Sequence, residues 1–72
     1  MSVDIISRLA TNLKRLRKAK GLSQEKFAFE AGIHRTYVSD IERAARNPSI
    51  SMLDKLAAPL GVSASDLVAE VD

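Results

Sequence analysis

The sequence predicts an all-α fold, a compact five-helix bundle that contains a helix-turn-helix motif. Apolar residues recur at spacings of three and four along most of the chain, which is the repeat of one buried face of an α-helix. No stretch alternates apolar and polar residues over the length of a β-strand. We expect residues 1–72 to form a single domain. Helix-ending signals divide it into five segments at Gly21, Gly32, Asn47-Pro48 and Gly61.

The first helix is predicted over about residues 4–19. Its buried stripe, with spacings of three, four and three, consists of Ile6, Leu9, Leu13 and Leu16, with Ile5 and Ala10 beside it. The basic residues off this stripe are Arg8, Lys14, Arg15 and Lys18. Gly21 ends the helix at a position that accepts a left-handed backbone, and the basic last turn interacts favourably with the helix dipole.

The helix-turn-helix is predicted over about residues 23–44, with Ser23 as the N-cap of its first helix and Gly32 at the turn. Its buried residues are Phe27, Ala28, Ala31, Ile33, Val38 and Ile41. The second helix of the motif, about 34–44, has a polar outer face that consists of Arg35, Thr36, Tyr37, Ser39 and Asp40. A second helix with a polar outer face is how this motif enters the major groove of DNA.

The C-terminal segment, about residues 50–70, is predicted to form two further helices for the core and for dimerisation. The apolar residues of the fourth helix are Met52, Leu53, Leu56, Ala57 and Leu60. Pro59 cannot donate a hydrogen bond to the carbonyl of Lys55, so we expect it to kink this helix or end it early. Ser63 and Asp66 have the spacing of a capping box for the fifth helix, about residues 64–69.

The net charge of +2 is distributed unevenly along the chain. Residues 8–46 contain ten of the eleven Lys and Arg residues against four acidic ones, a local charge of +6, whereas residues 47–72 carry −3. A basic segment of this kind is typical of a surface that binds nucleic acid. For any single lysine, a solvated position on a helix is the simpler interpretation.

The residue types present argue against catalysis and metal binding. The chain has no cysteine and only one histidine, His34, so no metal site is predicted. It has no Ser/His/Asp set, glycine-rich phosphate loop or suitable carboxylate pair, so we expect no enzyme activity, cofactor or small-molecule ligand. No apolar run approaches the roughly 20 residues of a membrane span, and no signal-peptide pattern is present. These absences predict a cytoplasmic protein with no membrane partner.

The candidates for base recognition are Arg35, Thr36, Tyr37 and Ser39. Arg35 lies in the first turn of its helix, and its guanidinium matches two major-groove acceptors of guanine. Thr36 can contact a thymine methyl group or a phosphate. The alternative is that Arg35 is a surface charge and Tyr37 a packing residue, but the adjacent turn and the basic surroundings favour recognition. Asp40 would repel phosphate unless it accepts a hydrogen bond from a cytosine amine or an arginine.

The candidates for contacts with DNA phosphates are Gln24, His34, Arg43, Arg46, Asn47 and Ser49. Gln24 lies beside the N–H groups at the start of its helix, where phosphate binds readily. A simple exposed position is an equally good interpretation of Gln24. Arg46 and Asn47 can instead lie in a loop without contacting DNA, and Ser49 can be a helix cap.

The residues resemble those of the Cro/cI (XRE) family, the λ-repressor-like helix-turn-helix domains. The resemblance covers about residues 8–69 and includes R-x-x-x-G-L-S-Q-E, A-G-I, S-x-I-E-R, N-P-S and L-G-V. The run H-R-T-Y-V-S-x-I-E-R-x-x-R-N-P-S is most similar to the controller proteins of restriction–modification systems. This resemblance implies a homodimeric transcriptional regulator that binds a double-stranded operator, with RNA polymerase as a further candidate partner. It places Arg35, Thr36, Tyr37 and Ser39 on base-reading or groove-facing positions, and Gln24, Arg43, Arg46 and Asn47 on phosphate-contacting ones.

The same resemblance implies a structural ion pair between Arg17 in the first helix and Glu42 after the recognition helix. Two residues depart from the family pattern. Phe29 occupies a commonly polar position, and Pro59 stands where a helix-forming residue is usual.

A two-fold dimer is expected, because half-sites one DNA turn apart, roughly 34 Å, require two recognition helices related by a dyad. The first and third helices are occupied by the core and the DNA, so the interface is expected in the C-terminal half. The expected interface residues, some of which also serve the core, are Ile50, Met52, Leu53, Leu60, Val62, Leu67 and Val68.

A function of another class is also open at this stage. The same fold can act as an antitoxin-like or adaptor module that binds a partner protein through Phe29 and the acidic C-terminal end. Salt-dependent binding to duplex DNA distinguishes the two functions, because only phosphate neutralisation gives it. The polar outer face of the third helix favours DNA.

Overall fold

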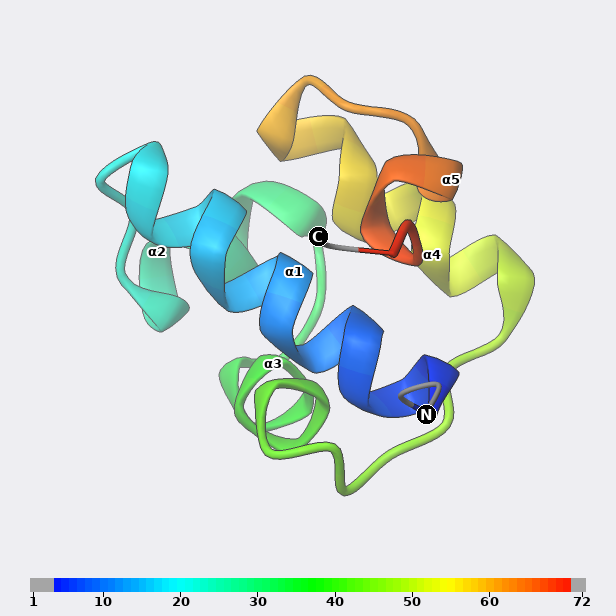
Figure 1. Ribbon diagram of the computed structural model, residues 1–72. Helices are drawn as coiled ribbons and strands as arrows, with labels where there is room; N and C mark the ends of the chain where they lie inside the picture. The colour runs from blue at the N-terminus through cyan, green and yellow to red at the C-terminus, as the bar shows by residue number, and fades with distance from the viewer. Residues whose placement is uncertain (1–3, 71–72) are drawn as a thin grey trace.

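The computed structural model describes residues 4–70 as a bundle of helices without any strand in that range (Figure 1). This confirms the predicted fold class. The elements in chain order are α1 (Ile5–Ala19), α2 (Gln24–Ala31), α3 (Arg35–Glu42), α4 (Ile50–Ala57), the short 3-10 helix η1 (Ala58–Leu60) and α5 (Ala64–Leu67). Within residues 4–70, none of these helices is long and apolar enough to cross a membrane.

Helix α1 lies in the middle of the bundle and joins its two parts (Figure 1). It packs against α3 of the helix-turn-helix and against α5 of the C-terminal segment, while α2 packs on α3 and α4 on α5. Both parts therefore share one hydrophobic core. The core residues with essentially no exposed surface are Leu13, Phe27, Val38, Ile41, Leu56 and Leu67.

The helices begin and end largely where the local sequence predicts. Ser23 is the N-cap of α2, and Ser63 forms a complete capping box with Asp66 at the start of α5. Gly32 has φ of 73° and makes the turn between α2 and α3, a backbone that only glycine adopts without strain. Helix α4 ends at Ala57, and Pro59 lies in η1, which confirms that proline ends this helix early.

Helix α3 ends at Glu42, two residues before the predicted end. The reason is Ala44, which has φ of 57° in the left-handed region. The N–H of Ala44 donates to the carbonyl of Ile41, and the N–H of Ala45 donates to the carbonyl of Asp40. These two hydrogen bonds form a Schellman motif, in which the left-handed residue is usually glycine. Here that residue is an alanine, so nothing in the sequence indicated that the helix ends at this point.

Asn12 connects the C-terminal segment to α1 by hydrogen bonds, a role that was not predicted from the sequence. Its side chain is fully buried, and Nδ2 donates to the carbonyls of Leu67 at 3.0 Å and Ala69 at 2.9 Å. Arg8 Nε adds a hydrogen bond of 3.0 Å to the carbonyl of Val68. These donors satisfy carbonyls at the end of α5, which no helical N–H reaches. The only signal was a polar residue beside the buried stripe of α1.

Candidate nucleic-acid interface

The predicted ion pair between Arg17 and Glu42 is present and joins α1 to the end of α3. Arg17 Nε lies 2.6 Å from Glu42 Oε2 and Nη2 lies 2.9 Å from Oε1, which makes the pair bidentate. Arg17 Nη1 also donates to the carbonyl of Leu22 at 2.7 Å. The two side chains are 8% and 3% exposed, and the hydrogen bonds to Glu42 raise the pKa of Arg17 above its ordinary value. The pair fixes the orientation of α3 on the bundle.

Gln24 belongs to the same hydrogen-bond network. Its Nε2 donates to Glu42 Oε1 at 3.1 Å, and the residue is half-buried. The start of α2 is thereby attached to the end of α3. The place of Gln24 at the start of its helix predicted a phosphate contact or a simple exposed position, whereas its contact with Glu42 was not predicted. A phosphate contact for Gln24 stays a prediction.

The start of α3 presents its side chains to solvent. Arg35 and Thr36 are both exposed, while Tyr37 and Ser39 are half-buried. His34 is the N-cap of the helix, since its Nδ1 accepts a hydrogen bond of 3.0 Å from the N–H of Thr36. No group of three His, Asp or Glu residues suitable for a metal ion occurs within residues 4–70. The side chains of Arg35 and Thr36 in the first turn of α3 are therefore accessible to a ligand.

The other end of the outer face of α3 carries a group of interacting side chains, which we name the Asp40 cluster: Tyr37, Asp40, Arg43 and Arg46. Asp40 accepts hydrogen bonds from Arg43 at 2.5 Å and from Arg46 at 3.2 Å. The Arg46 guanidinium lies over the Tyr37 ring, 4.4 Å from its centre. The hydrogen bonds from Arg46 and then Arg43 hold the pKa of Asp40 below its ordinary value. Asp40 was expected to accept a hydrogen bond from either a cytosine amine or an arginine, and in the structure it accepts from two arginines.

Asn47 and Ser49 follow the Asp40 cluster in the segment between α3 and α4, and both are exposed. Ser49 is the N-cap of α4, because its Oγ accepts a hydrogen bond of 3.2 Å from the N–H of Met52. Its hydroxyl also lies 3.2 Å from that of Ser51. The cap alone accounts for Ser49, and phosphate contacts by Asn47 and Ser49 stay predictions.

Two of the residues expected at a dimer interface lie in the core. Leu60 is 4% exposed and Leu67 is 0% exposed, so both side chains are buried in the core of their own chain. Some residues of this set were expected to serve the core as well, and Leu60 and Leu67 do so; a dimer contact by either residue stays a prediction. Ile50 is 84% exposed, and the partly buried residues that pack at the edge of the core are Met52, Leu53, Val62 and Val68.

An apolar groove of about 80 Å³ lies between the start of α1 and the segment that leads into α4. The residues that line it are Ile5, Ile6, Leu9, Asn47, Pro48, Leu53 and Val68. Ile5 is 52% exposed at its edge. The groove therefore adjoins two of the predicted interface residues, Leu53 and Val68.

A short helix, a sharp turn at Gly32 and a second helix with an exposed polar face define a DNA-binding helix-turn-helix protein. The profile of the helix-turn-helix family HTH_3 matches residues 13–67. The chain belongs to this family, of the XRE type.

Two relatives show how far the similarity extends. Control protein C.BamHI of Bacillus amyloliquefaciens is 47% identical over 57 residues, which cover 78% of this chain and 70% of that protein. Control protein C.MunI of a Mycoplasma species is 44% identical over 70 residues, which cover 96% of this chain and 95% of that protein. Similarity therefore extends over nearly the whole of both C.MunI and this chain.

Solved structures have the same fold. A hypothetical transcription factor from Neisseria, solved as a crystal structure, is 44% identical to this chain with a TM-score of 0.89. The match covers 92% of this chain and 76% of the Neisseria chain. The controller protein C.Esp1396I, solved as a tetramer in complex with its natural 35 base-pair operator, is 35% identical with a TM-score of 0.80. That match covers 86% of this chain and 82% of the other. The chain is a DNA-binding transcriptional regulator of the helix-turn-helix class.

Proposed function

We propose that this regulator is the controller of a restriction–modification operon and binds a palindromic operator as a homodimer. One observation carries the proposal: the 44% identity with control protein C.MunI over 96% of this chain and 95% of that protein. The exposed polar face of α3 supports it, because it provides the surface that such a function requires. Operator binding then regulates transcription in the cytoplasm, and the chain has no enzymatic role.

In this proposal the first turn of α3 recognises bases. Arg35 is exposed and its guanidinium can donate two hydrogen bonds to the O6 and N7 of one guanine. Thr36 lies beside it and can contact a thymine methyl group or a phosphate. Tyr37 and Ser39 are half-buried on the same helix, so we assign them contacts at the edge of the recognised bases.

Phosphate contacts surround this recognition surface in the proposal. Arg43 and Arg46 can exchange their hydrogen bonds to Asp40 for hydrogen bonds to phosphate oxygens, which are also anionic acceptors. The remaining candidates for phosphate contacts are Gln24, His34, Asn47 and Ser49. These contacts position the protein on the duplex and contribute no sequence discrimination of their own.

The proposed dimer uses the exposed and partly buried apolar residues of the C-terminal half. Ile50 is the strongest candidate because 84% of its surface is exposed. The other candidates are Met52, Leu53, Val62 and Val68, each packed at the edge of the core. A two-fold axis through this surface would present two α3 helices to half-sites about one DNA turn apart, roughly 34 Å.

Selection of bound sites from random duplexes tests the operator, and sedimentation tests the dimer. We expect the selected sites to form a palindrome with half-sites about ten base pairs apart, as a dyad requires. Unrelated sequences without two-fold symmetry would contradict the proposal. A 7.8 kDa monomer at tens of micromolar, both with and without operator DNA, would contradict the dimer.

One observation favours a second candidate function, binding of a partner protein. Phe29 on α2 is 79% exposed, and its only described ring contact is with the Lys26 amine, 5.7 Å from the ring centre. RNA polymerase is the partner expected for a regulator that activates transcription. Phe29→Ser should leave operator affinity unchanged and reduce activated transcription in a purified system, whereas unchanged activation would exclude this surface.

A further inference from the structure

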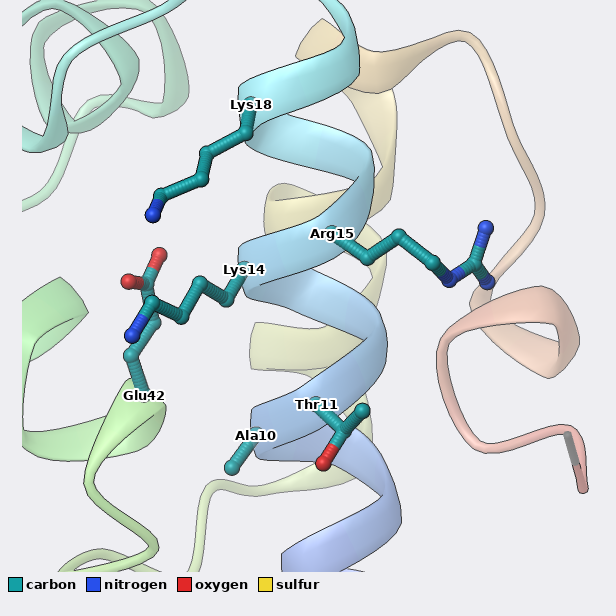
Figure 2. A pocket seen from close by; sticks show the side chains of 6 residues that line it. All are labelled: Ala10, Thr11, Lys14, Arg15, Lys18 and Glu42. Atoms are coloured by element: carbon teal, nitrogen blue, oxygen red, sulfur yellow. The ribbon is translucent and has the colours of Figure 1, made fainter.

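A groove of about 370 Å³ lies between α1 and the end of α3, outside the proposed recognition surface. Its lining residues are Ala10, Thr11, Lys14, Arg15, Lys18 and Glu42. Figure 2 shows the side chains of Lys14 and Lys18 extending from α1 to the same side as the Glu42 carboxylate. Arg15 extends to the opposite side of α1. The part of the groove beside Glu42 is thus lined by two ammonium groups one helical turn apart.

The Glu42 carboxylate does not neutralise these lysines. Its two oxygens already accept hydrogen bonds from Arg17 and from Gln24. Within residues 4–70, no carboxylate lies within ion-pair distance of Lys14 or Lys18. Three cations (Arg17, Lys14 and Lys18) therefore surround one anion (Glu42), which leaves two positive charges in excess on this side of the groove.

The groove also adjoins the elements that approach DNA. Glu42 is the last residue of α3, and its hydrogen bond to Gln24 brings the start of α2 to the same place. A duplex that lies against α3 and the start of α2 must continue past one of their edges. One of these edges is the one beside α1, and the excess charge lies there, on the side chains of Lys14 and Lys18 (Figure 2).

We propose that Lys14 and Lys18 form a phosphate-binding site at this groove, separate from the contacts made by α3. The site holds one phosphate group between the two ammonium groups, and Glu42 limits how deeply an anion can enter. The phosphate belongs to the DNA backbone flanking the operator or to a free polyphosphate such as pyrophosphate. Two experiments test this site, one with DNA and one with pyrophosphate. The DNA experiment rests on the proposed function, whereas the pyrophosphate experiment does not depend on it.

The DNA experiment compares Lys14→Gln/Lys18→Gln with Lys20→Gln/Lys55→Gln, which removes the same charge elsewhere. Lys55 lies on α4, and the Lys20 amine lies beside Gly61, the C-cap residue of η1. Affinity is measured over a salt series for the operator alone and for the operator with flanking base pairs. On the longer duplex we expect the first variant, but not the control, to lower the salt slope by about 0.9 per protomer, the value for one phosphate. Both variants should behave alike on the short duplex.

The second experiment titrates pyrophosphate into the protein without DNA and follows the amide resonances of α1 by NMR. Saturable shifts that disappear in Lys14→Gln/Lys18→Gln and persist in Lys14→Arg/Lys18→Arg would support a site for free phosphate. If neither the flanking DNA nor pyrophosphate distinguishes the first variant from the control, the proposal is wrong. If the wild-type protein fails to select a palindrome, only the proposed operator binding is contradicted. The pyrophosphate titration would still show whether Lys14 and Lys18 form a phosphate-binding site.

Discussion

Two carboxylates on α3, Glu42 and Asp40, both bind arginine but in opposite surroundings. They lie two residues apart, so they point about 200° apart around the helix axis. Glu42 faces the bundle, where its side chain is 3% exposed and holds Arg17 of α1. Asp40 faces outward, and its side chain is 18% exposed. It forms ion pairs with Arg43 and Arg46, which follow it closely in the sequence. The same chemistry therefore joins helices on one side and arranges the side chains of the proposed binding surface on the other.

Burial decides what each ion pair contributes. Breaking a well-buried pair leaves one charge without a partner in a place that water does not reach, and this is strongly destabilising. An exposed pair contributes little to stability, because water and salt screen it. We therefore expect changes at Arg17 to affect unfolding and changes in the Asp40 cluster to affect DNA binding.

The largest expected effect is on stability, from Arg17→Met. The substitution leaves the buried Glu42 carboxylate with Gln24 as its remaining partner, so we expect a loss of about 3–5 kcal/mol in the free energy of unfolding. Urea denaturation of Arg17→Met and of Lys18→Met provides the measurement. Lys18 is exposed, so its variant should unfold close to the wild-type midpoint. Equal midpoints for the two variants would show that the pair does not hold the fold.

The next effect concerns DNA and separates the two ends of the outer face of α3. Arg35→Ala should lose about 1–3 kcal/mol of discrimination at one base pair, because it removes the proposed bidentate contact to guanine. Arg46→Ala should instead weaken binding to all sequences alike and lower the salt slope by about one unit. The measurement is affinity for the operator and its single-base variants across a salt series. If Arg35→Ala weakens every site equally, base recognition belongs to Thr36 and Tyr37.

A smaller effect is expected at the bend that ends α3. Ala44 adopts φ of 57°, a left-handed backbone that costs an L-residue roughly 1–2 kcal/mol. Glycine relieves this strain but adds freedom to the unfolded chain, so Ala44→Gly should raise the free energy of unfolding by about 0.5–1 kcal/mol. Thermal unfolding measures the change, with Ala45→Gly as the neighbouring control. A destabilised Ala44→Gly variant would mean that Ala44 is not strained.

The smallest effect is on the titration of Asp40. Hydrogen bonds from Arg46 and Arg43 lower the pKa of Asp40 in the folded protein. These contacts therefore stabilise the folded state when the pH is above the pKa that Asp40 has in the unfolded chain. The contribution is lost as the pH falls through the lower folded pKa. Carbon-detected NMR of the Asp40 carboxyl should therefore show its titration midpoint rise in Arg46→Gln. Lys26→Gln, on α2, should leave the midpoint where it is, and a similar rise in both variants would remove Arg46 as the cause.

Much of the fold was predictable because it depends on residues within one turn of each other. The N-caps at Ser23 and Ser63, the turn at Gly32 and the early end of α4 before Pro59 all follow from contacts that span four residues or fewer. The apolar repeat likewise predicted which face of each helix is buried. The polar outer face of α3 was visible in the same way, since it is the complement of that repeat.

What only the tertiary structure decided depends on residues far apart in the sequence. Asn12 is buried because carbonyls 55 and 57 residues away need a donor, and Gln24 bonds Glu42 across 18 residues. Leu60 and Leu67 fill the core, whereas Ile50 with the same apolar character is exposed, because burial depends on which elements pack nearby. The sequence by itself determined the local elements and the charges. Packing decided which polar side chains hold the bundle together and which stay exposed on α3, since burial sets the strength of every ion pair and hydrogen bond.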